Sequence, residues 1–593
     1  MRCGVDTGGT FTDLVTDNGR IAKVLSTPDD PGRAIRSGLE ALEGGARPDL
    51  LAHGTTVATN TLLERRGAAV ALVTNTGFAD VIEIARQDRP SLYDLWADRP
   101  EPLVPRHLRL KVDGRLDASG REIEPVGTAP AVPAGVEAVA VCLLHADLNP
   151  SHERAVAAAL VSPGSVPLDV SCSSDVSPEF REYERTVTTV VNAYLRPRCR
   201  GYLAGLVGLA GEVLVMTSAG GLVPTGDAAD RPVALLLSGP AGGVGASAAA
   251  ARAAGFAGAV TFDMGGTSTD VCLVQGGVPE PAAGRRAAGF PIRLPSLDIH
   301  TIGAGGGSLA RIDPGGALVV GPESAGADPG PACYGLGGRR PTVTDADLVL
   351  GRIPADAVFP GLGGLDRSAA AGALADAGVS AEGVVRVVDA AMERAVRAVS
   401  VERGVDPSGL ALVAFGGAGP LHACALAEAL GMAAVVVPAR AGVLSAVGLL
   451  CAPRRRSLVR SWPTPGDHGG VDTALAELGQ RAGSLVGSGA QVTTSVDCRY
   501  SGQSHELTVA TVDDFPAEHL RRNGYVRDGA QVEVVALRAS AAAPAVLRPG
   551  DLGPVERRPG HGPCVLAEAD CTIWVPDGWA ADVAADGSYV LSR

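Results

Sequence analysis

Two copies of one eight-residue motif carry the residue types that phosphate and metal chemistry requires. The copies span residues 6–13 and 263–270 and read DTGGTFTD and DMGGTSTD. Adjacent glycines allow positive φ angles and bring bare backbone N–H groups close to an anion, while a carboxylate at the end of a strand can hold a hydrated metal ion. Two such segments facing each other would hold one polyphosphate from opposite sides.

Short apolar runs flank each copy and indicate how the motif is positioned. Residues 3–5 and 14–15 surround the first copy, and residues 260–262 and 271–274 surround the second. An apolar run on each side of a Gly-Gly-Thr turn predicts a β-hairpin. One such hairpin alone is most often an ordinary tight turn. Because the motif recurs near the start of both halves of the chain, a functional role is the better interpretation.

Further glycine-rich turns follow predicted strands in the second half of the chain. They lie at residues 217–221, 238–245, 303–307 and 416–419, and an apolar run precedes each, such as residues 235–237. Glycine runs are costly in backbone entropy, so a close approach of the backbone to a ligand explains them better than chance. The turn at 416–419 opens a predicted helix, a position that suits a phosphate or the flat face of a nucleoside.

Polar side chains at other strand ends are candidates for substrate or metal contacts. His53 lies where a strand runs into a polar turn and then a helix. For this residue we weigh a ligand role equally against a capping or core histidine. Asp298 and His300 alternate along one predicted strand and therefore face the same side. These three residues are the candidates for orienting a substrate.

Two stretches outside these motifs have a distinctive composition. Residues 89–106 contain four prolines, with Tyr93 and Trp96 between them. They predict an irregular segment that is either a flap over a site or a surface excursion. Residues 178–200 predict a charged helix, in which the arginines and glutamates of residues 181–185 are spaced to pair with each other. A solvated or domain-joining helix is the expected result.

The composition is that of a soluble protein with several domains. The 593 residues are 46% hydrophobic, which predicts three or four domains with a core each. A net charge of −14 argues against nucleic acid as the main ligand. No apolar run is long enough to cross a membrane, no signal peptide precedes the first strand, and the eleven cysteines are scattered. We therefore expect a cytoplasmic protein with reduced, mostly buried thiols and neither a nucleic-acid nor a membrane partner.

Seven motifs in one order resemble the hydantoinase A and oxoprolinase family, within the actin, sugar-kinase and heat-shock ATPase superfamily. They are residues 6–13, 53–60, 181–186, 238–243, 263–270, 302–308 and 414–422. The resemblance implies an α/β fold in which two ribonuclease-H-like (actin-like ATPase) domains surround an ATP cleft. The alternating pattern of the last portion of the chain, as in residues 532–537 and 571–575, predicts a β-rich C-terminal accessory domain. The expected domains are residues 1–180, 181–455 and 456–593.

The resemblance also assigns roles to the paired motifs. It implies ATP and Mg2+ as cofactors, with Asp6 and Asp263 holding the metal through its waters. The acceptor would be oriented by His53 and by the pair Asp298 and His300. The residues expected to bind the phosphates and the nucleoside are Gly8, Gly9, Thr10, Gly265, Gly266, Thr267, Ser268, Gly305, Gly306, Gly416, Gly417 and Gly419.

The expected activity follows from the same resemblance. An ATP-dependent amidohydrolase subunit would phosphorylate the carbonyl oxygen of a cyclic amide, such as a hydantoin, 5-oxoproline or a related lactam, for ring opening. One alternative is the ATP-using subunit of an acetone-type carboxylase, and another is an actin-like ATPase switch or scaffold. Fused oxoprolinases carry a second, unrelated half, so we expect a hydantoinase B-type partner subunit and a homo- or hetero-oligomer.

Overall fold

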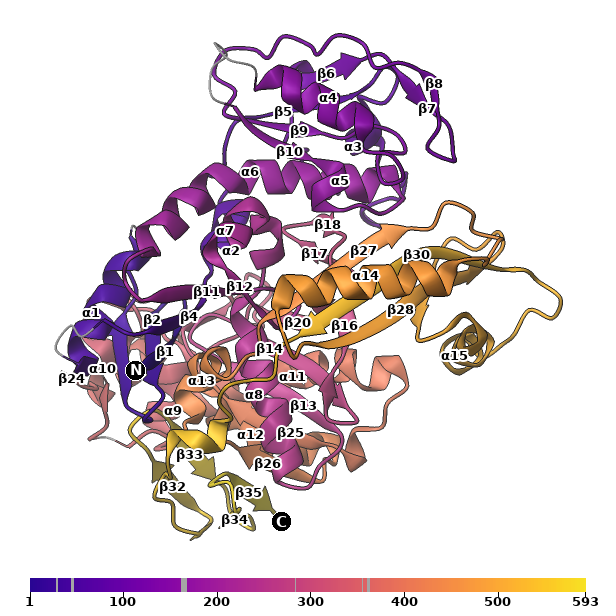
Figure 1. The fold of residues 1–593 in the computed structure, drawn as a ribbon. Helices are drawn as coiled ribbons and strands as arrows, with labels where there is room; N and C mark the ends of the chain where they lie inside the picture. The colour runs from indigo at the N-terminus through magenta and orange to yellow at the C-terminus, as the bar shows by residue number, and fades with distance from the viewer. Residues whose placement is uncertain (28–29, 44–46, 162–167, 283, 355, 360–362) are drawn as a thin grey trace.

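The computed structural model of the 593-residue chain describes all residues except 28–29, 44–46, 162–167, 283, 355 and 360–362 (Figure 1). Two α/β bodies, each built on one large sheet, form the centre of the molecule. A smaller α/β unit from residues 70–172, called the inserted unit below, lies above the first body. A sheet covered by one long helix projects to one side, and we call it the accessory sheet.

The first sheet begins with the predicted hairpin and third strand. Its strands run in the order β12-β11-β4-β1-β2-β3, with β1 antiparallel to β2 and parallel to β4. Strands β1 and β4 are mostly buried, as expected of neighbouring parallel strands that are covered on both faces. The bounds are β1 Arg2–Thr7, β2 Phe11–Thr16, β3 Ile21–Leu25, β4 Leu50–Gly54, β11 Glu212–Met216 and β12 Leu222–Pro224.

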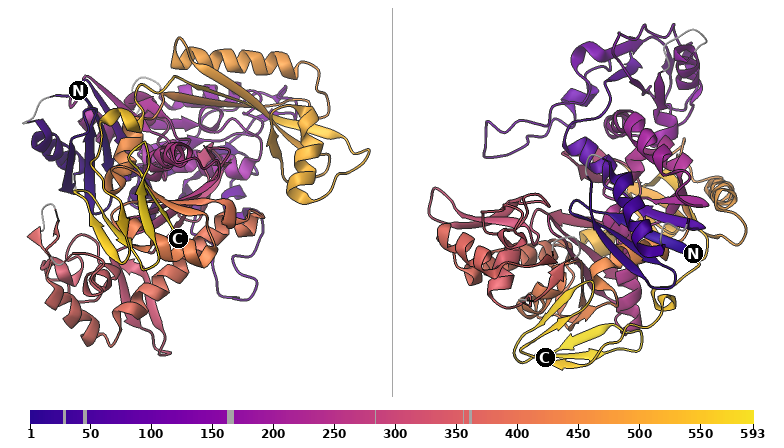
Figure 2. Two further views of the ribbon diagram at one scale, coloured as in Figure 1. Left: turned by 90° about the horizontal axis from the view of Figure 1, so that it is seen from below. Right: turned by 90° about the vertical axis from the view of Figure 1, so that its left-hand side faces the viewer.

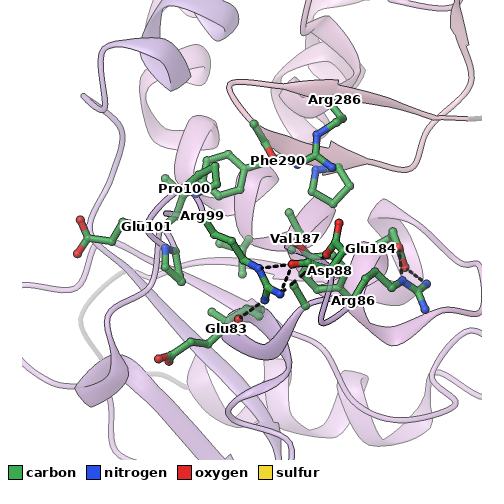
Figure 3. Close-up of a pocket in the computed structure, with 18 of the residues that line it drawn as sticks. Glu83, Arg86, Asp88, Arg99, Pro100, Glu101, Glu184, Val187, Arg286 and Phe290 are labelled. Atoms are coloured by element: carbon green, nitrogen blue, oxygen red, sulfur yellow. Dashed lines mark hydrogen bonds and ion pairs between the residues drawn. The ribbon is translucent and has the colours of Figure 1, made fainter. Parts of the chain in front are cut away.

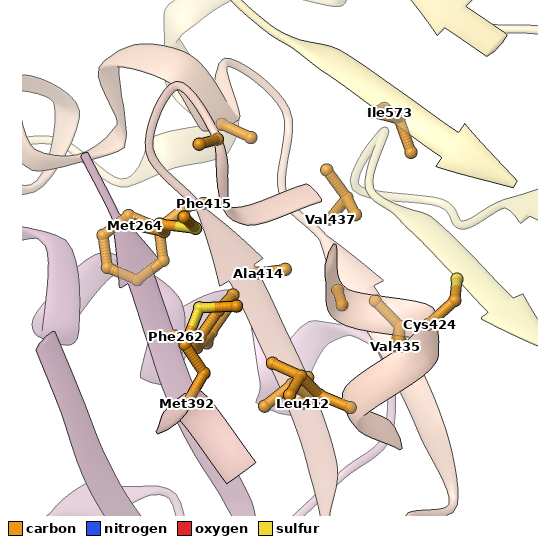
Figure 4. Close-up of a cluster of buried hydrophobic side chains, with 14 of the residues drawn as sticks. Phe262, Met264, Met392, Leu412, Ala414, Phe415, Cys424, Val435, Val437 and Ile573 are labelled. Atoms are coloured by element: carbon orange, nitrogen blue, oxygen red, sulfur yellow. The ribbon is translucent and has the colours of Figure 1, made fainter. Parts of the chain in front are cut away.

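The second sheet repeats this arrangement. Hairpin β13–β14 is followed by β25, which runs parallel to β13, and by β26, which runs parallel to β25. Fully buried side chains of these strands, among them Phe262, Leu412 and Val435, form the core in Figure 4. The bounds are β13 Ala259–Met264, β14 Thr269–Gln275, β15 Val278–Pro279, β20 Ile299–Ile302, β25 Ala411–Phe415 and β26 Ala434–Val437.

Two helices, α8 (Gly239–Ala253) and α13 (Leu444–Leu450), join the two bodies. Helix α8 follows the first sheet in the chain but packs on β13 and β25, and α13 follows the second sheet but packs on β1 and β4. The predicted strand at 235–237 is wrong, because the chain there forms a 3-10 turn over Pro232–Leu235 and enters α8. Its apolar residues are buried by tertiary packing, which an apolar run alone does not distinguish from a strand.

The inserted unit is a four-stranded parallel sheet in the order β10-β9-β5-β6. The long helix α6 (Glu182–Leu206) packs under β9 and β10 and also contacts α2 (Val57–Leu63) of the first body. It therefore connects the inserted unit with that body. The remaining bounds are β5 Val70–Asn75, α3 Val81–Ile84, β6 Arg109–Val112, β7 Arg115–Leu116, β8 Glu122–Glu124, β9 Ala138–Val141, α4 Ser151–Leu160, β10 Asp169–Cys172 and α5 Ser173–Val176.

The charged start of α6 differs from its prediction. Instead of pairing along the helix, Arg185 is fully buried and donates to Asp147 (2.6 Å) and to the carbonyl of Leu143 (2.8 Å). Arg181 instead pairs with Glu506 of the accessory sheet (2.6 Å). The domain-joining interpretation is therefore right and the solvated one is wrong, because the arginines find carboxylates on other elements.

The C-terminal part of the chain divides between two sheets. The accessory sheet, ordered β27-β30-β28-β29, carries α14 on one face. The chain then returns, and β35 (Tyr589–Ser592) pairs with β26 of the second sheet and with β34 (Ala580–Val583). The bounds of the accessory elements are β27 Arg455–Ser461, α14 Val471–Val486, β28 Gln491–Tyr500, β29 Leu507–Val509, α15 Phe515–Asn523 and β30 Val532–Ala542.

Strand pairing therefore crosses both predicted domain boundaries. Strands β11 and β12, beyond residue 180, complete the first sheet, and β34 and β35, beyond residue 456, extend the second. These pairings are non-local, so a composition change along the chain does not mark them.

The remaining elements complete the two bodies and the C-terminal part of the chain. They are α1 Pro31–Glu43, β21 Ser308–Ile312, β22 Leu318–Ser324, α9 Val343–Val349, α10 Arg367–Asp376, α11 Ala381–Val399, α12 Gly419–Leu430, β31 Gly560–His561, β32 Cys564–Ala567 and β33 Thr572–Val575.

Two expectations about composition can be compared with the structure. All eleven cysteines are free, and most of them are buried, as expected of reduced thiols. Among the described residues, no helix combines the length and the apolar character that a membrane crossing requires.

Candidate active site

The two predicted hairpins meet at their turns. We call residues 8–10, between β1 and β2, turn 1, and residues 265–268, between β13 and β14, turn 2. A Cβ atom placed on Gly9 would lie 3.9 Å from Thr267 Oγ1, and one placed on Gly266 would lie 3.2 Å from Thr10 Oγ1. The two copies of the motif, more than 250 residues apart in sequence, thus face each other directly.

Each turn is held from behind by another segment. Ser26, just after β3, donates its hydroxyl to the Gly8 carbonyl (2.8 Å) and its N–H to the Thr10 carbonyl (3.0 Å). In turn 2 the N–H groups of Gly306 and Gly307 donate to the carbonyls of Gly265 (2.9 Å) and Gly266 (2.6 Å). A trans peptide is planar with its C=O and N–H opposed, so these bonds aim the following N–H groups away from the supports. The N–H groups of Gly9, Gly266 and Thr267 therefore point away from the supports, an orientation that suits an anion.

This support corrects the role expected for Gly305 and Gly306. A Cβ on Gly305 would lie 2.7 Å from the carbonyl carbon of Gly266, and one on Gly306 would lie 2.8 Å from Thr344 Oγ1. Close packing behind turn 2 explains why both residues are glycines. The N–H of Gly306 donates to the Gly265 carbonyl and is therefore not available to a ligand. Ser26 acts in the same way for turn 1. A single serine after a strand gives no sequence signal for such a role.

Four carboxylates line the bases of the two turns. Asp6 and Asp13 are directly opposite each other across β1 and β2, and Asp263 and Asp270 are opposite across β13 and β14. Directly opposed residues of antiparallel strands project from one face. Each hairpin therefore presents two carboxylates together, and all four are partly exposed. Lys23, whose Nζ lies 2.7 Å from Asp13 Oδ1, balances part of this charge.

Burial raises the pKa of all four carboxyl groups, and the charges of neighbouring carboxylates add to this effect for Asp6 and Asp263. For Asp6, burial is the larger cause and the charge of Asp13 adds to it, raising the pKa to about 8. Burial raises the pKa of Asp270 to about 6. The pKa of Asp263 is also raised, by burial first and then by the charges of Asp270 and Asp6. The two hairpins thus share one negative field, which a divalent cation with oxygen ligands would neutralise.

The predicted nucleoside segment borders this carboxylate group. Gly416 has a φ of +80°, and a Cβ on it would lie 2.4 Å from Asp263 Oδ1, so only glycine fits beside this carboxylate. Gly419 begins α12, and its Cβ would lie 3.3 Å from the carbonyl oxygen of Phe262. Gly417 is exposed, and no described atom lies within 4 Å of its Cβ position. Of the three glycines, Gly417 is the one whose small size packing does not explain.

Asp298 and His300 do not join this group. His300 is directly opposite Val271 in the pairing of β20 with β14, whereas Thr301 is opposite Asp270 and bonds to its carboxylate. The side chain of His300 therefore projects from the face of the sheet opposite to Asp270. Asp298 lies at the same end of β20 and forms an ion pair with Arg403. A strand was predicted here correctly, but Asp298 precedes it, and which face points toward the hairpin carboxylates depends on strand register.

His53 is a core histidine. It is fully buried opposite Val5 on β4, with Nδ1 3.3 Å from the Val5 carbonyl and Nε2 2.7 Å from the Tyr202 hydroxyl on α6. Burial lowers its pKa to about 4, so the ring is neutral. Asp6 is opposite Gly54, the next residue, and therefore projects from the other face of the sheet. Of the two interpretations weighed for His53, the structure favours the core role.

Comparison with known proteins agrees with this geometry. The hydantoinase/oxoprolinase N-terminal region matches residues 2–162, and the hydantoinase/oxoprolinase model matches residues 185–457, so together they cover most of the chain. The chain belongs to the hydantoinase/oxoprolinase family. Turn 1 lies in the first matched region and turn 2 in the second.

Relatives in the hydantoinase/oxoprolinase family include characterised enzymes. The caprolactamase subunit alpha of Pseudomonas jessenii is 34% identical, with 100% of this chain and 99% of the relative aligned. The crystal structure of ATP-dependent caprolactamase from that organism superposes with a TM-score of 0.84 at 31% identity, covering 100% of both chains. The 5-oxoprolinase 1 of Arabidopsis thaliana is 35% identical over 76% of this chain and 41% of its own length.

A second solved structure shares the fold of this hydantoinase/oxoprolinase chain. Nucleotide-free acetone carboxylase has a TM-score of 0.78 at 24% identity, covering 100% of this chain and 99% of that one. At this identity the match supports the α/β architecture alone. It agrees with two sheets of one topology joined by α8 and α13.

Proposed function

We propose that this chain binds Mg-ATP between turn 1 and turn 2 and transfers the γ-phosphoryl group to the carbonyl oxygen of a cyclic amide. The observation that carries this proposal is the meeting of two turns that share the sequence Gly-Gly-Thr, each with a pair of carboxylates at its base. Phosphoryl transfer needs positioning and charge neutralisation more than covalent chemistry, and this arrangement supplies both.

We assign a separate role to the backbone N–H groups, to the carboxylates and to Gly417. The N–H groups of Gly9, Gly266 and Thr267 donate to phosphate oxygens, because the carbonyl of each same peptide group, on the preceding residue, is held on the opposite side. Asp6 and Asp263 would hold Mg2+ through water molecules, since magnesium keeps several waters and prefers carboxylate oxygens. When bound, the ion would supply positive charge that offsets the charge of the phosphates. Gly417 leaves open space where the nucleoside can pack.

Cyclic amides are proposed as acceptors because of the family and its characterised members. The P. jessenii relative is named an ATP-dependent caprolactamase, and this chain aligns with it over its whole length. In the reaction the amide oxygen forms a bond to the γ-phosphorus as the bond to the β-phosphate oxygen breaks. The resulting imidate-like phosphate has an electrophilic carbon that water attacks. Loss of phosphate and cleavage of the C–N bond then open the ring.

A partner subunit belongs to this proposal. The P. jessenii relative is named as an alpha subunit, a name that implies at least one other subunit in that enzyme. We propose that this chain performs the phosphorylation and that a hydantoinase B-type subunit completes ring opening. The chain alone would then release ADP slowly with a suitable amide and faster in the complex.

The test is ADP release by the purified chain with Mg-ATP and a panel of acceptors. The panel contains caprolactam, 5-oxoproline, hydantoin and a simple ketone with bicarbonate, each with and without the B-type subunit. We expect one cyclic amide to stimulate ADP release at least tenfold. Stimulation by the ketone and bicarbonate alone would replace the proposal with carboxylation. ADP release that no acceptor changes would replace it with an ATPase switch.

A further inference from the structure

The predicted irregular segment contains a cluster of exposed apolar side chains. Leu92, Tyr93, Leu95 and Trp96 are 75%, 96%, 82% and 91% exposed. We call residues 91–97 the apolar tip. Figure 2 shows the segment that carries it as a loop standing away from the inserted unit. Four large apolar side chains within five residues are unusual on a protein surface, where such residues normally lie singly.

Local hydrogen bonds hold the apolar tip in one shape. The Ser91 hydroxyl accepts from the N–H groups of Tyr93 (3.3 Å) and Asp94 (3.0 Å). The Asp94 carboxylate in turn accepts from the N–H of Trp96 (2.9 Å). Serine and aspartate turns of this kind fix the backbone without tertiary contacts. The aromatic rings are thus presented outward at a small entropic cost for binding.

The base of the loop is anchored to the body of the protein. The Arg99 guanidinium donates to the carbonyls of Asp88 (3.1 Å) and Ile84 (2.6 Å), and Arg86 pairs with Glu184 at the start of α6 (Figure 3). Here the loop lines a pocket of about 240 Å³ together with Phe290 of β18 (Phe290–Ile292). These contacts hold the base of the loop against α6 and the inserted unit, so the loop projects from the surface in a defined direction.

We propose that the apolar tip is the anchor by which this chain docks into an apolar pocket of its partner subunit, an inference that rests on the proposed function. The apolar tip contains Asp94 and neither lysine nor arginine, and the flanking Arg99 is held at the base of the loop by backbone carbonyls, so the tip itself offers no cation to an anionic lipid surface. A pocket with apolar walls and a basic rim on another protein fits this combination. Tyrosine and tryptophan are also the residue types that dominate binding energy at protein interfaces.

The size of the apolar tip indicates its share of the interface. A tyrosine and a tryptophan each bury about 150–250 Å². Even with the two leucines, the tip supplies less surface than a stable interface buries on one partner, about 800 Å². The tip is therefore the centre of a larger contact, and its aromatic residues are expected to carry much of the affinity.

The test measures binding of the full chain to the purified B-type hydantoinase subunit from the same organism. The double variant Tyr93→Ala/Trp96→Ala is compared with the native chain and with Ile123→Ala. Ile123 is a matched control because it is 66% exposed on β8 of the same inserted unit. We expect the double variant to raise Kd at least about 100-fold, as for two interface anchors, and the control to change it less than twofold.

A second measurement separates docking from folding and from activity. Trp96 is the most exposed of the four tryptophans, so acrylamide quenching of its fluorescence should fall when the complex forms. Trp96→Phe should remove that change while the complex still forms. Equal Kd for the native chain and the double variant, or no complex with the native chain, would overturn the docking proposal. So would loss of self-association in the double variant, which would identify a second copy as the occupant.

These outcomes are distinct from failure of the proposed function. Binding and quenching are measured without ATP or an amide, so a docking tip can be established even if no cyclic amide stimulates ADP release. Conversely, an active complex whose affinity does not depend on Tyr93 and Trp96 would keep the function and remove the docking role.

Discussion

At the scale of single residues, the site depends on four carboxylates that the fold brings together without balancing their charge. Only Lys23 pairs closely with one of them, Asp13, among the described residues. The pKa of each is raised, so the metal-free protein holds protons that bound metal would displace. Four neighbouring carboxyl groups with raised pKa values supply the oxygen ligands and the negative charge that suit a divalent cation.

The raised pKa of Asp6 predicts a pH dependence of stability. A folded-state pKa of about 8 exceeds the unfolded value near 3.8, so the folded protein retains a proton that the unfolded chain loses. In EDTA, this group makes the free energy of unfolding fall between pH 4 and pH 8, by at most about 1.4 kcal/mol per pH unit. Water reaching the partly exposed side chain reduces the slope. Thermal unfolding of Asp6→Asn should show a flatter profile than the native chain, and identical profiles would contradict this prediction.

Gly416 and Gly417 provide a matched pair of substitutions. Gly416→Ala should destabilise the protein by about 2 kcal/mol or more, because its φ is +80° and its Cβ would meet Asp263. Gly417→Ala should leave the melting temperature unchanged and raise KM for ATP about tenfold, since open space lies beside it. Thermal unfolding and ADP release distinguish them. An unchanged KM in Gly417→Ala would remove this glycine from the nucleoside contact.

At the scale of elements, the two bodies are coupled through glycines of α8 and α13. A Cβ on Gly448 of α13 would lie 1.9 Å from the carbonyl oxygen of Gly242 on α8, and one on Gly4 of β1 would lie 2.1 Å from the carbonyl of Ala446. These close approaches fix how the two sheets, and therefore the two turns, sit against each other. The motif at residues 238–243 thus includes glycines required by helix packing.

Gly448→Ala should lower the free energy of unfolding by about 1–3 kcal/mol, as overpacking does, and weaken ATP binding by separating the turns. Gly245→Ala in α8 is the matched control because no described atom lies within 4 Å of its Cβ position. It should stabilise the helix by about 0.5–1 kcal/mol. Calorimetric unfolding with and without Mg-ATP measures both effects. Equal behaviour of the two variants would show that the helix contact does not set the site.

Local pattern explains which elements were predictable. Both hairpins are indicated by short apolar runs on either side of turn glycines, and they occur where predicted. The pairing of β35 with β26 and the support of turn 1 by Ser26 join distant segments, and short-range patterns do not specify them. The side of the sheet on which His53 and His300 lie depends on register in the same way. The motif was therefore predictable, whereas its supports were not.

At the scale of the whole molecule, a buried network of charges joins the start of α6, the segment that follows β18 and the accessory sheet. Glu179, fully buried before α6, accepts from Arg293 (3.0 Å) and from Arg538 of β30 (2.8 Å). Arg538 also pairs with Asp497 (2.7 Å), and Arg293 pairs with Glu506 (2.6 Å). The network holds the accessory sheet against the start of α6 and the segment that follows β18.

Removing the charge of Glu179 tests this connection. Glu179→Gln leaves two buried arginines short of a counter-charge and should cost about 3–5 kcal/mol. The exposed pair of Glu428 with Arg593 (2.7 Å) offers the control, and Glu428→Gln should change stability by less than about 1 kcal/mol. Chemical unfolding and limited proteolysis between the body and the accessory sheet measure the difference. Equal stability of the two variants would show that the network is not needed to hold the sheet.

The most direct test of the central claim is ADP release by Asp263→Asn with Mg-ATP and the stimulating amide. Burial and neighbouring acids already favour the neutral form of this carboxyl in the metal-free fold, so the neutral amide should leave the melting temperature unchanged. We predict a loss of turnover of at least about 1,000-fold, while Asp298→Asn, whose aspartate pairs with Arg403 away from the turns, stays within threefold of the native rate. Normal turnover by folded Asp263→Asn would contradict ATP binding between the two hairpins.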